Sequence, residues 1–304
     1  MSNDTFPSVT APDAFVGLDI GGSKTRGILW VNGAVAADAS VGSANVQNVS
    51  IETARQHMAE LFAQLDVGDV QVVFAGAGGV DTDDDADALR ALIAPFVPGA
   101  QITVVHDTRL LLAAGGATTG VAVIAGTGSA AWGANDDGDQ ARAGGWGYLL
   151  GDEGSGYWLG REAVRYSLHQ MDLGAPADEL TRELLKYCKL NEPGELIGHF
   201  HQGTTRRYWA AASPVIFAAA ANGHAHALDL VDQAGADLAG MAHQVANQLG
   251  IQGPIVLGSG LGSNVPALQE AFTRHLAAKG ITDVRILAQD PIAGVPLLVS
   301  AREL

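Results

Sequence analysis

A strand, a tight glycine turn and a second strand occur twice in this chain, and this repeat limits the fold more than any other feature. The first copy is the apolar run AFVGLDI (14–20), followed by two glycines and the strand-like run KTRGILWV. The second begins at Val121, in VAVIAGTGSAAWG, and residues 18–23 align with residues 124–129 at a constant offset of 106. Each copy ends in an Asn-Gly or Asp-Gly turn, typical of hairpins. A duplicated unit of this kind predicts two lobes.

Strands and helices are mixed along the rest of the chain, which predicts an α/β protein. The amphipathic run IETARQHMAELFAQL (51–65) predicts a helix, and QITVVHD (101–107) predicts a buried strand. The second half of the chain is mostly helical in period, interrupted by the strand and glycine turn of GPIVLGSGLGSN (253–264). The expected parts are a disordered tail over residues 1–13, an N-terminal lobe over 14–117 and a C-terminal lobe over 118–304.

The charge balance excludes several kinds of partner. The chain has 17 Lys and Arg against 33 Asp and Glu, a net charge of −16, so it lacks the basic surface of a nucleic-acid or anionic-membrane binder. No apolar run approaches the ~20 residues of a membrane span, and the N-terminus has no signal-peptide pattern, so a cytoplasmic protein is expected. The single cysteine, Cys188, excludes an intrachain disulfide and a metal site built on several cysteines of this chain.

The familiar nucleotide motifs are incomplete. Gly17 and Gly22 have the spacing of a Walker loop, but Ser23 stands where that motif requires Lys. The run at Gly258–Gly262 is not G-x-G-x-x-G, and no G-x-S-x-G occurs. These absences weaken the P-loop, Rossmann and serine-hydrolase interpretations. Tight glycine turns flanked by hydroxyls remain, and their backbone N–H groups could hold a polyphosphate, although most such turns are ordinary.

Two aspartates stand at the ends of predicted strands. Asp19 is the penultimate residue of the first apolar strand, which delivers its carboxylate to the glycine turn, a position that suits a hydrated Mg²⁺. Asp107 ends the strand QITVVHD, where the ligand crevice of an open α/β sheet lies. It either accepts a proton from a substrate hydroxyl or caps the following helix, and the pattern alone leaves both roles open.

Five motifs together resemble the BadF/BadG/BcrA/BcrD-type ATPases, and within them the N-acetylglucosamine and glucosamine kinases: GLDIGGSKT, HDTRLLLAAG, VIAGTGSAAWG, GGWGYLLGDEGSGYWLGREA and GPIVLGSGLGSN. The resemblance covers roughly residues 14–302, and the fourth motif is the most specific. It implies a two-lobe actin/hexokinase-like (ribonuclease H-like) fold with ATP and sugar in the interlobe cleft. It also implies ATP-dependent phosphorylation of the 6-hydroxyl of an amino sugar, with Mg²⁺. The sequence does not give the oligomeric state, although a two-lobe kinase of this type is often a homodimer.

The resemblance also implies roles for single residues. Asp107 matches the catalytic aspartate that activates the sugar hydroxyl, although the family usually has Asn where this chain has His106. The other sugar-binding positions match Asn45, Gly145, Trp146 and Asp152. The ATP-binding positions match Gly21, Gly22, Ser23, Thr25, Thr127, Gly128, Ser129, Gly258 and Gly260. Asp19 belongs to the first phosphate motif and is the expected metal ligand.

The glycine-rich loop GGWGYLLGDEGSGYWLG (144–160) is then understandable as a sugar site. A carboxylate can accept hydrogen bonds from two sugar hydroxyls, and bare backbone reaches others only where no side chain intervenes. We therefore assign Asp152 to sugar hydroxyls and Glu153 to a supporting hydrogen bond. Trp146 either covers an apolar face of the ring or is a core residue.

Two other functions fit the same resemblance. One is an ATPase activator of an acyl-CoA dehydratase or reductase, which needs a cysteine-ligated cluster between subunits, and Cys188 alone gives this little support. The other is a non-catalytic sugar sensor, against which the presence of Asp19, Asp107 and the three glycine turns argues. The sequence does not distinguish glucosamine from N-acetylglucosamine.

Overall fold

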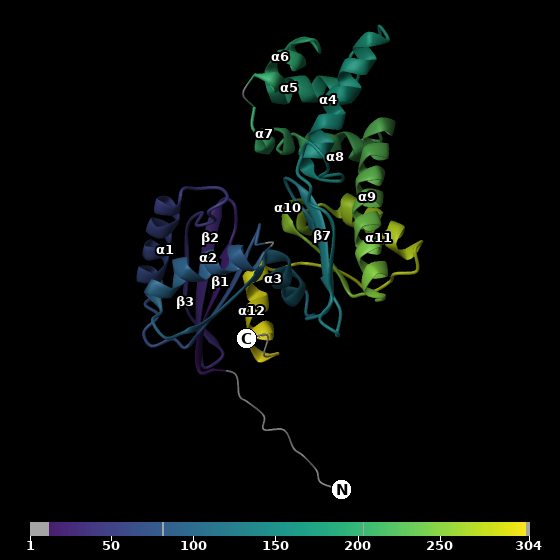
Figure 1. Cartoon of the computed structure of the whole chain (residues 1–304). Coiled ribbons are helices and arrows are strands. Elements are labelled where there is room, and N and C mark those ends of the chain that lie inside the picture. The colour runs from purple at the N-terminus through teal and green to yellow at the C-terminus, as the bar shows by residue number, and fades with distance from the viewer. Residues whose placement is uncertain (1–11, 81, 203, 302–304) are drawn as a thin grey trace. The chain divides into compact units, whose positions relative to one another are not determined.

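The computed structural model describes residues 12–80, 82–202 and 204–301, which form two compact units (Figure 1). Unit 1 contains the chain up to Thr118 and the segment from Gln289 onward, and unit 2 runs from Thr119 to Ala288. The first boundary lies one residue from the expected one. Most of the expected N-terminal tail lies outside the described residues. Asp13 is described, and its carbonyl accepts a hydrogen bond from the N–H of Asn32 (2.7 Å).

Unit 1 is built on a mixed five-stranded sheet with the order β3-β2-β1-β4-β5. The first three strands form an antiparallel meander, and β4 and β5 continue the sheet parallel to β1. The strands are β1 (Ala14–Ile20), β2 (Lys24–Val31), β3 (Ala34–Gly42), β4 (Val72–Ala77) and β5 (Gln101–His106). The carboxyl ends of β1, β4 and β5 therefore meet at one edge.

Alternation along β1 gives this sheet a core on each face, because successive side chains of a strand point to opposite sides. Leu18 and Ile20 pack in a core with α1 (Ile51–Leu65) and α2 (Asp83–Ile93). The short 3₁₀ helix η1 (Ala94–Phe96) directly follows α2 in the chain. Phe15 belongs to the opposite core. The helix predicted over residues 51–65 is confirmed at both ends, and the side chain of Ser50 caps it.

The C-terminal segment corrects the expected extent of the second lobe. From Gln289 onward the chain belongs to unit 1, where η2 (Pro291–Gly294) and α12 (Val295–Ser300) pack against α3 (Asp107–Ala114) (Figure 1). Ile292 is fully buried in the core that these helices share with the sheet. Apolar periodicity indicates that a terminal helix is buried, but it does not indicate which lobe buries it.

Unit 2 repeats this layout, with a mixed sheet in the order β10-β9-β6-β7-β8. The strand before the second glycine turn, β6, is central as β1 is in unit 1; it pairs antiparallel with β7 and parallel with β9. The predicted repeat is thus a repeat of topology. The strands are β6 (Gly120–Ala125), β7 (Ser129–Ala134), β8 (Gln140–Gly144), β9 (Ile255–Gly258) and β10 (Val284–Ile286).

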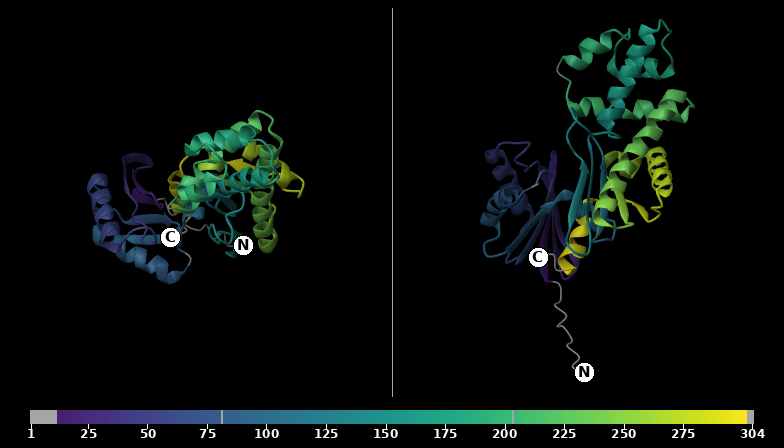
Figure 2. Two further views of the ribbon diagram at one scale, coloured as in Figure 1. Left: turned by 90° about the horizontal axis from the view of Figure 1, so that it is seen from above. Right: turned by 45° about the vertical axis from the view of Figure 1, so that its right-hand side comes forward.

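Helices make up most of the remainder of unit 2, as expected (Figure 2). They share one apolar core with its sheet. The longest, α9 (Ala225–Leu249), contacts β6, β7 and β8 and packs against α8 and α11. No helix formed by the described residues combines the length and apolar character that crossing a bilayer requires. The others are α4 (Gly156–Asp172), α5 (Glu179–Cys188), α6 (Glu195–His201), α7 (Arg206–Ala210), α8 (Ser213–Ala221), α10 (Ser259–Asn264) and α11 (Pro266–Ala277).

Candidate active site

The first glycine turn joins β1 to β2 at the carboxyl end of β1. The N–H of Gly21 donates to the carbonyl of Lys24 (3.0 Å), which closes the turn, and the Ser43 hydroxyl donates to the carbonyl of Gly21 (2.8 Å). Gly22 and Ser23 are exposed at the tip. The turn is therefore held from within the protein while its tip stays open to a ligand.

Two hydroxyl residues predicted to bind ATP are buried at the bases of the two turns. Thr25 is fully buried, and its Oγ1 accepts the N–H of Ala44 (2.9 Å). Ser129, in unit 2, is 4% exposed, and its Oγ donates to the carbonyl of Glu153 (2.7 Å). In the described conformation each side chain is therefore hydrogen-bonded to the backbone of its own unit and stabilises the turn beside it.

Asp19 lies beside the first turn among other acids of unit 1. Burial and then the charges of Asp107 and Asp290 raise the pKa of its carboxyl from 3.8 to about 7, while Lys24 and Arg26 act in the opposite direction. A bound cation would relieve this repulsion, so the carboxylate fits the oxygen ligand that Mg²⁺ prefers. No set of three or more His, Cys, Asp or Glu side chains in the described ranges could hold a metal by itself. Nucleotide phosphates would have to supply the remaining ligands.

Asp290 was missed by the sequence analysis. Its Oδ2 lies 2.9 Å from Arg26 Nη1 and 3.8 Å from Lys24 Nζ, so two cations hold it beside Asp19. The Asp290-Pro291 pair is a recognisable helix start. Nothing local in the sequence, however, indicates that this segment returns to the first sheet.

Asp107 is the first residue of α3, at the carboxyl end of β5. The cap of that helix is His106, whose Nδ1 accepts the N–H of Thr108 (3.3 Å). The alternative that Asp107 caps the helix is therefore wrong. Its Oδ1 is buried without a hydrogen-bond donor among the described residues. His106 Nδ1 lies 3.0 Å from that oxygen, but in the neutral ring a nitrogen that accepts a hydrogen bond donates none.

Asn45 and Gly78 lie next to Asp107 in unit 1. Asn45 is buried, and its Nδ2 donates to the carbonyl of Gly78 (2.8 Å) while its Oδ1 accepts the N–H of Gln47 (2.9 Å). A Cβ added at Gly78 would stand 3.1 Å from Asp107 Oδ2. The predicted sugar residue Asn45 and the predicted base Asp107 thus both lie next to Gly78.

The second glycine turn, in unit 2, rests on Asp152. The N–H of Gly126 donates to the carbonyl of Gly128 (3.0 Å), and the N–H of Ser129 donates to Asp152 Oδ1 (3.2 Å). A Cβ at Gly128 would lie 2.9 Å from both carboxylate oxygens, so glycine permits this contact. Asp152 itself has a left-handed backbone (φ 63°), which costs a non-glycine residue energy and is seen mostly at constrained sites.

The second oxygen of Asp152 is available for a substrate hydroxyl. Oδ2 is buried without a hydrogen-bond partner among the described residues. Burial raises the pKa of this carboxyl, while the Ser129 N–H and the Arg206 guanidinium, 4.0 Å from Oδ2, lower it. Arg206 was not predicted, and no local pattern marks it.

The remaining predicted sugar residues flank Asp152 in different ways. Gly145 has φ 72°, and its N–H donates to the carbonyl of Ser129 (3.1 Å), which ties the loop to the second turn. Glu153 is exposed and supports Ser129 through its backbone carbonyl rather than its carboxylate. Trp146 is 61% exposed beneath the Arg142 guanidinium (4.6 Å to the ring centroid), so its interpretation as a core residue is wrong.

The expected adenosine turn is instead the end of β9 followed directly by the helix α10 (Ser259–Asn264), and this helix start adjoins the second phosphate turn within unit 2. Gly258 ends β9 and pairs with Ile124 of the parallel strand β6. A Cβ at Gly126 would stand 2.6 Å from Ser259 Oγ, which places the phosphate turn in contact with the start of α10. Gly260 is exposed, with open space where a side chain would stand. The predicted ATP residues Thr127, Gly128, Gly258 and Gly260 therefore form one group.

Comparison with known proteins agrees with these motifs. Residues 16–294 match the model of the BadF/BadG/BcrA/BcrD ATPase family. The N-acetylmuramic acid/N-acetylglucosamine kinase of Clostridium acetobutylicum is 28% identical over 273 residues, which cover 86% of this chain and 89% of that protein. The N-acetyl-D-glucosamine kinase of Dictyostelium discoideum is 30% identical over 259 residues, covering 79% and 81%.

Solved structures agree on the fold. A structure from Chromobacterium violaceum, 26% identical, has a TM-score of 0.73 and covers 96% of this chain and 100% of its own. The ROK hexokinase of Thermus thermophilus, 17% identical, has a TM-score of 0.57 and covers 95% and 97%. The predicted actin/hexokinase-like class is confirmed. The chain belongs to the BadF/BadG/BcrA/BcrD ATPase family.

Proposed function

We propose that this protein is an ATP-dependent kinase that phosphorylates the 6-hydroxyl of an amino sugar, N-acetylglucosamine or glucosamine. The names of the two curated relatives support the sugar class, and the family supports the use of ATP. The observation that carries the proposal is the placement of Asp107. Its carboxylate stands at the carboxyl edge of the parallel strands with a buried oxygen that has no donor among the described residues, and His106 performs the capping that would otherwise explain it.

In this proposal Asp107 is the general base. Its carboxylate accepts the proton of the 6-hydroxyl while that oxygen bonds to the γ-phosphorus of ATP. The bond from the γ-phosphorus to the β–γ bridging oxygen breaks, and ADP leaves with the bonding electrons. Mg²⁺ near Asp19 would neutralise charge on the phosphates. His106 orients the base by capping the helix that begins with it.

In this proposal, residues of unit 2 contact both the sugar and ATP. Asp152 Oδ2 accepts hydrogen bonds from sugar hydroxyls, which satisfies a buried oxygen that receives no hydrogen bond from the described residues. The exposed ring of Trp146 is available to an apolar sugar face. The turn at Gly126–Gly128 and the start of α10 at Gly258–Gly260 bind ATP through backbone N–H groups. We also propose that the protein is a homodimer, and light scattering of the purified protein tests this.

One assay separates this function from its alternatives. ADP release is measured with glucosamine, N-acetylglucosamine, glucose and no sugar. A kinase releases ADP in proportion to an amino sugar added, and the product carries phosphate on its 6-oxygen, visible by ³¹P and ¹³C NMR. Sugar-independent hydrolysis that no sugar accelerates would indicate an ATPase activator instead. Sugar binding without ADP release would indicate a sensor. The burial of Cys188 within α5 speaks against a cluster ligand for an activator.

A further inference from the structure

The connection between β3 and α1, residues 43–50, passes beside the first glycine turn. In the antiparallel pairing of β2 with β3, Gly42 stands opposite Lys24, so the chain leaves the sheet at Ser43 next to the turn. The same connection carries Asn45, the proposed sugar residue of unit 1. One short segment therefore adjoins the turn proposed for phosphate and also supplies a contact proposed for the sugar.

The side chain of Ser43 bonds to the turn and to the sugar residue at once. Its hydroxyl donates to the carbonyl of Gly21 (2.8 Å) and accepts the N–H of Asn45 (3.2 Å). Ser43 is 5% exposed, so both bonds lie in the protein interior, where hydrogen bonds are stronger than in water. A hydroxyl carries one hydrogen, and its donation to Gly21 leaves the lone pairs to accept from Asn45. One buried side chain thus spans the two proposed ligand contacts.

Further contacts hold the segment around Ser43 in place. His57 Nδ1, from α1, lies 2.7 Å from the Ser43 carbonyl, and because a carbonyl only accepts, the ring nitrogen donates. A Cβ at Gly42 would overlap the His57 ring, so glycine lets the ring pack on the backbone there. Thr25 Oγ1 accepts the N–H of Ala44 (2.9 Å), which is a second link between the turn and the connection. The segment should therefore stay folded when only the Ser43 hydroxyl is removed.

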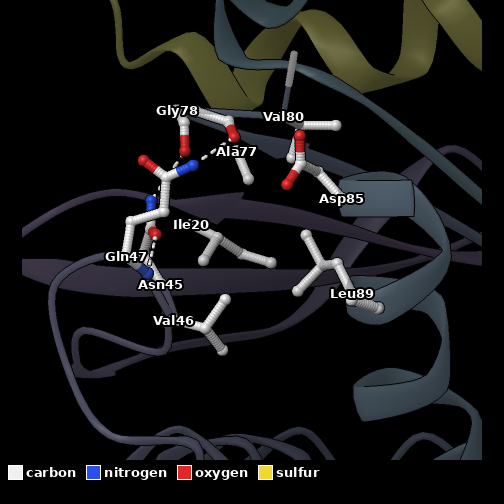
Figure 3. Close-up of a pocket in the computed structure, with 11 residues that line it drawn as sticks. Ile20, Asn45, Val46, Gln47, Ala77, Gly78, Val80, Asp85 and Leu89 are labelled. Carbon is white, nitrogen blue, oxygen red and sulfur yellow. Dashed lines mark hydrogen bonds between the residues drawn. The ribbon is translucent and has the colours of Figure 1, made fainter. Parts of the chain in front are cut away.

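Asn45 continues this chain of hydrogen bonds toward the proposed base. Its Nδ2 donates to the carbonyl of Gly78, directly after β4 (Figure 3), and a Cβ at Gly78 would stand 3.1 Å from Asp107 Oδ2. Its Oδ1 accepts the N–H of Gln47 (2.9 Å). Each of these two side-chain atoms can make a second hydrogen bond, which a sugar hydroxyl can use. The placement of Asn45 by Ser43 therefore affects the site where the sugar meets the base.

We propose that Ser43 is a positioning residue that couples nucleotide binding to sugar binding within unit 1. A phosphate bound at the exposed tip of the first turn orders the Gly21 carbonyl, which fixes the Ser43 hydroxyl and with it Asn45. Hydrogen bonds in such a chain polarise one another and strengthen together. The first ligand orders the segment, and the second ligand then binds at a smaller entropic cost. This inference rests on the proposed function, which supplies both ligands.

The test measures how strongly each ligand favours the other. Calorimetry gives the Kd of N-acetylglucosamine and of glucosamine, first without nucleotide and then with saturating Mg²⁺ and a non-hydrolysable ATP analogue. The ratio of the two Kd values for one sugar is its coupling factor. The reverse titration, of the analogue with and without that sugar, must give the same factor, because coupling between two sites is reciprocal. Ser43→Ala should lower the factor about fivefold, which is the lower end of typical couplings, since one of two links to the turn is lost.

Two further variants sharpen the measurement. Ser50→Ala is the matched control, because the Ser50 hydroxyl also bonds to the backbone within this connection but accepts the N–H of Thr53 (3.2 Å) at the start of α1. Its coupling factor should equal that of the wild type. His57→Phe keeps a ring on α1 but loses the bond to the Ser43 carbonyl, so the factor should fall. His57→Phe also replaces Ser43→Ala in the test if thermal melting shows that Ser43→Ala does not fold.

The outcomes separate this inference from the proposed function. A wild-type factor of one, or a Ser43→Ala effect that weakens each ligand without changing the factor, overturns the positioning role even if sugar-dependent ADP release shows a kinase. The role is also wrong if Ser50→Ala lowers the factor as much as Ser43→Ala does. A factor that only Ser43→Ala and His57→Phe lower, with no ADP release from the wild type, supports the positioning role and overturns the kinase. A wild type that binds no amino sugar or no nucleotide overturns both.

Discussion

The two glycine turns occupy equivalent places in two sheets of the same strand order, yet each meets a carboxylate in a different way. In unit 1 the strand before the turn supplies the acid itself, Asp19, and its position in the repeat corresponds to Ala125 in unit 2. In unit 2 the acid is Asp152, which comes from a loop and packs on the glycine of the turn. The first carboxylate faces other acids, whereas the second is held by a backbone N–H.

This difference separates what the repeat determines from what it does not. The duplicated strands determine the backbone of the turns and the sheet edge where we propose that ligands bind. The chemistry at each turn comes from segments far along the chain, namely Asp290 in unit 1 and Asp152 in unit 2. On our proposal unit 1 performs proton transfer and cation binding and contributes Asn45 to the sugar site, while unit 2 contributes Asp152 to sugar recognition and binds ATP.

The largest effect is expected at the proposed base. Asp107→Asn should lower kcat by about 10²–10⁴-fold, because the amide cannot accept the hydroxyl proton. Asp83→Asn is the matched control, since Asp83 is likewise the first residue of a helix, α2, and reports any loss of helix-dipole stabilisation. Steady-state ADP release measures both. Wild-type turnover in Asp107→Asn would refute the base.

The second prediction concerns Asp19 and has opposite signs for stability and activity. Because the folded-state pKa is raised to about 7 from 3.8, the charged carboxylate opposes folding. The penalty is absent below pH 4, grows between pH 4 and 7 and is complete above pH 7. At 1.36 kcal/mol per pKa unit it reaches about 4 kcal/mol as an upper bound.

Asp19→Asn should therefore be more stable than the wild type at pH 8 without Mg²⁺ or nucleotide, and equally stable at pH 3.5. Urea unfolding at both pH values measures this. Kinase activity should fall, because the proposed metal ligand is lost. An advantage that persists at pH 3.5, or none at pH 8, would show that the acids around Asp19 do not repel it.

Much of the fold could be predicted from the sequence, because it depends on local patterns. The repeat and the helix over residues 51–65 follow from apolar periodicity and glycine turns. The strand predicted over residues 101–107 ends at His106, and it is an edge strand in which only Val104 is buried, so its expected burial was wrong. The return of the chain from Gln289 to unit 1 could not be predicted, because apolar periodicity shows that a helix is buried but not which part of the fold buries it.

The candidate site divides in the same way. Asp107 was predictable as a site residue from its place at the end of a strand. Whether it caps the following helix or acts as a base could not be predicted, and only the capping of α3 by His106 excludes the first role. Thr25 and Ser129 have hydroxyls in a phosphate-binding pattern, but burial turns both inward. Asp290 and Arg206 depend on tertiary contacts, which no local pattern encodes.

In unit 2, Asp152→Ala should raise the KM for sugar at least tenfold, because a hydrogen bond to a charged group contributes about 1.5–3 kcal/mol. The KM for ATP should change little. Glu153→Ala is the control: this side chain is exposed, and only its backbone carbonyl contacts Ser129, so the sugar KM should stay within about twofold. Equal effects of both substitutions would mean that the loop, not the Asp152 carboxylate, sets affinity.

The smallest effects are expected from one matched pair of substitutions that compares the two turns directly. Gly128→Ala places a methyl group 2.9 Å from both oxygens of Asp152, so the carboxylate must move, and the sugar KM should rise several-fold. Gly22→Ala meets only the Asn48 side chain, at 3.3 Å, and should leave the sugar KM unchanged while altering the KM for ATP. Neither glycine has a left-handed backbone, so strain does not confuse the result. If Gly22→Ala raised the sugar KM as much as Gly128→Ala does, the two turns would not differ in function, and the division between the units would be wrong.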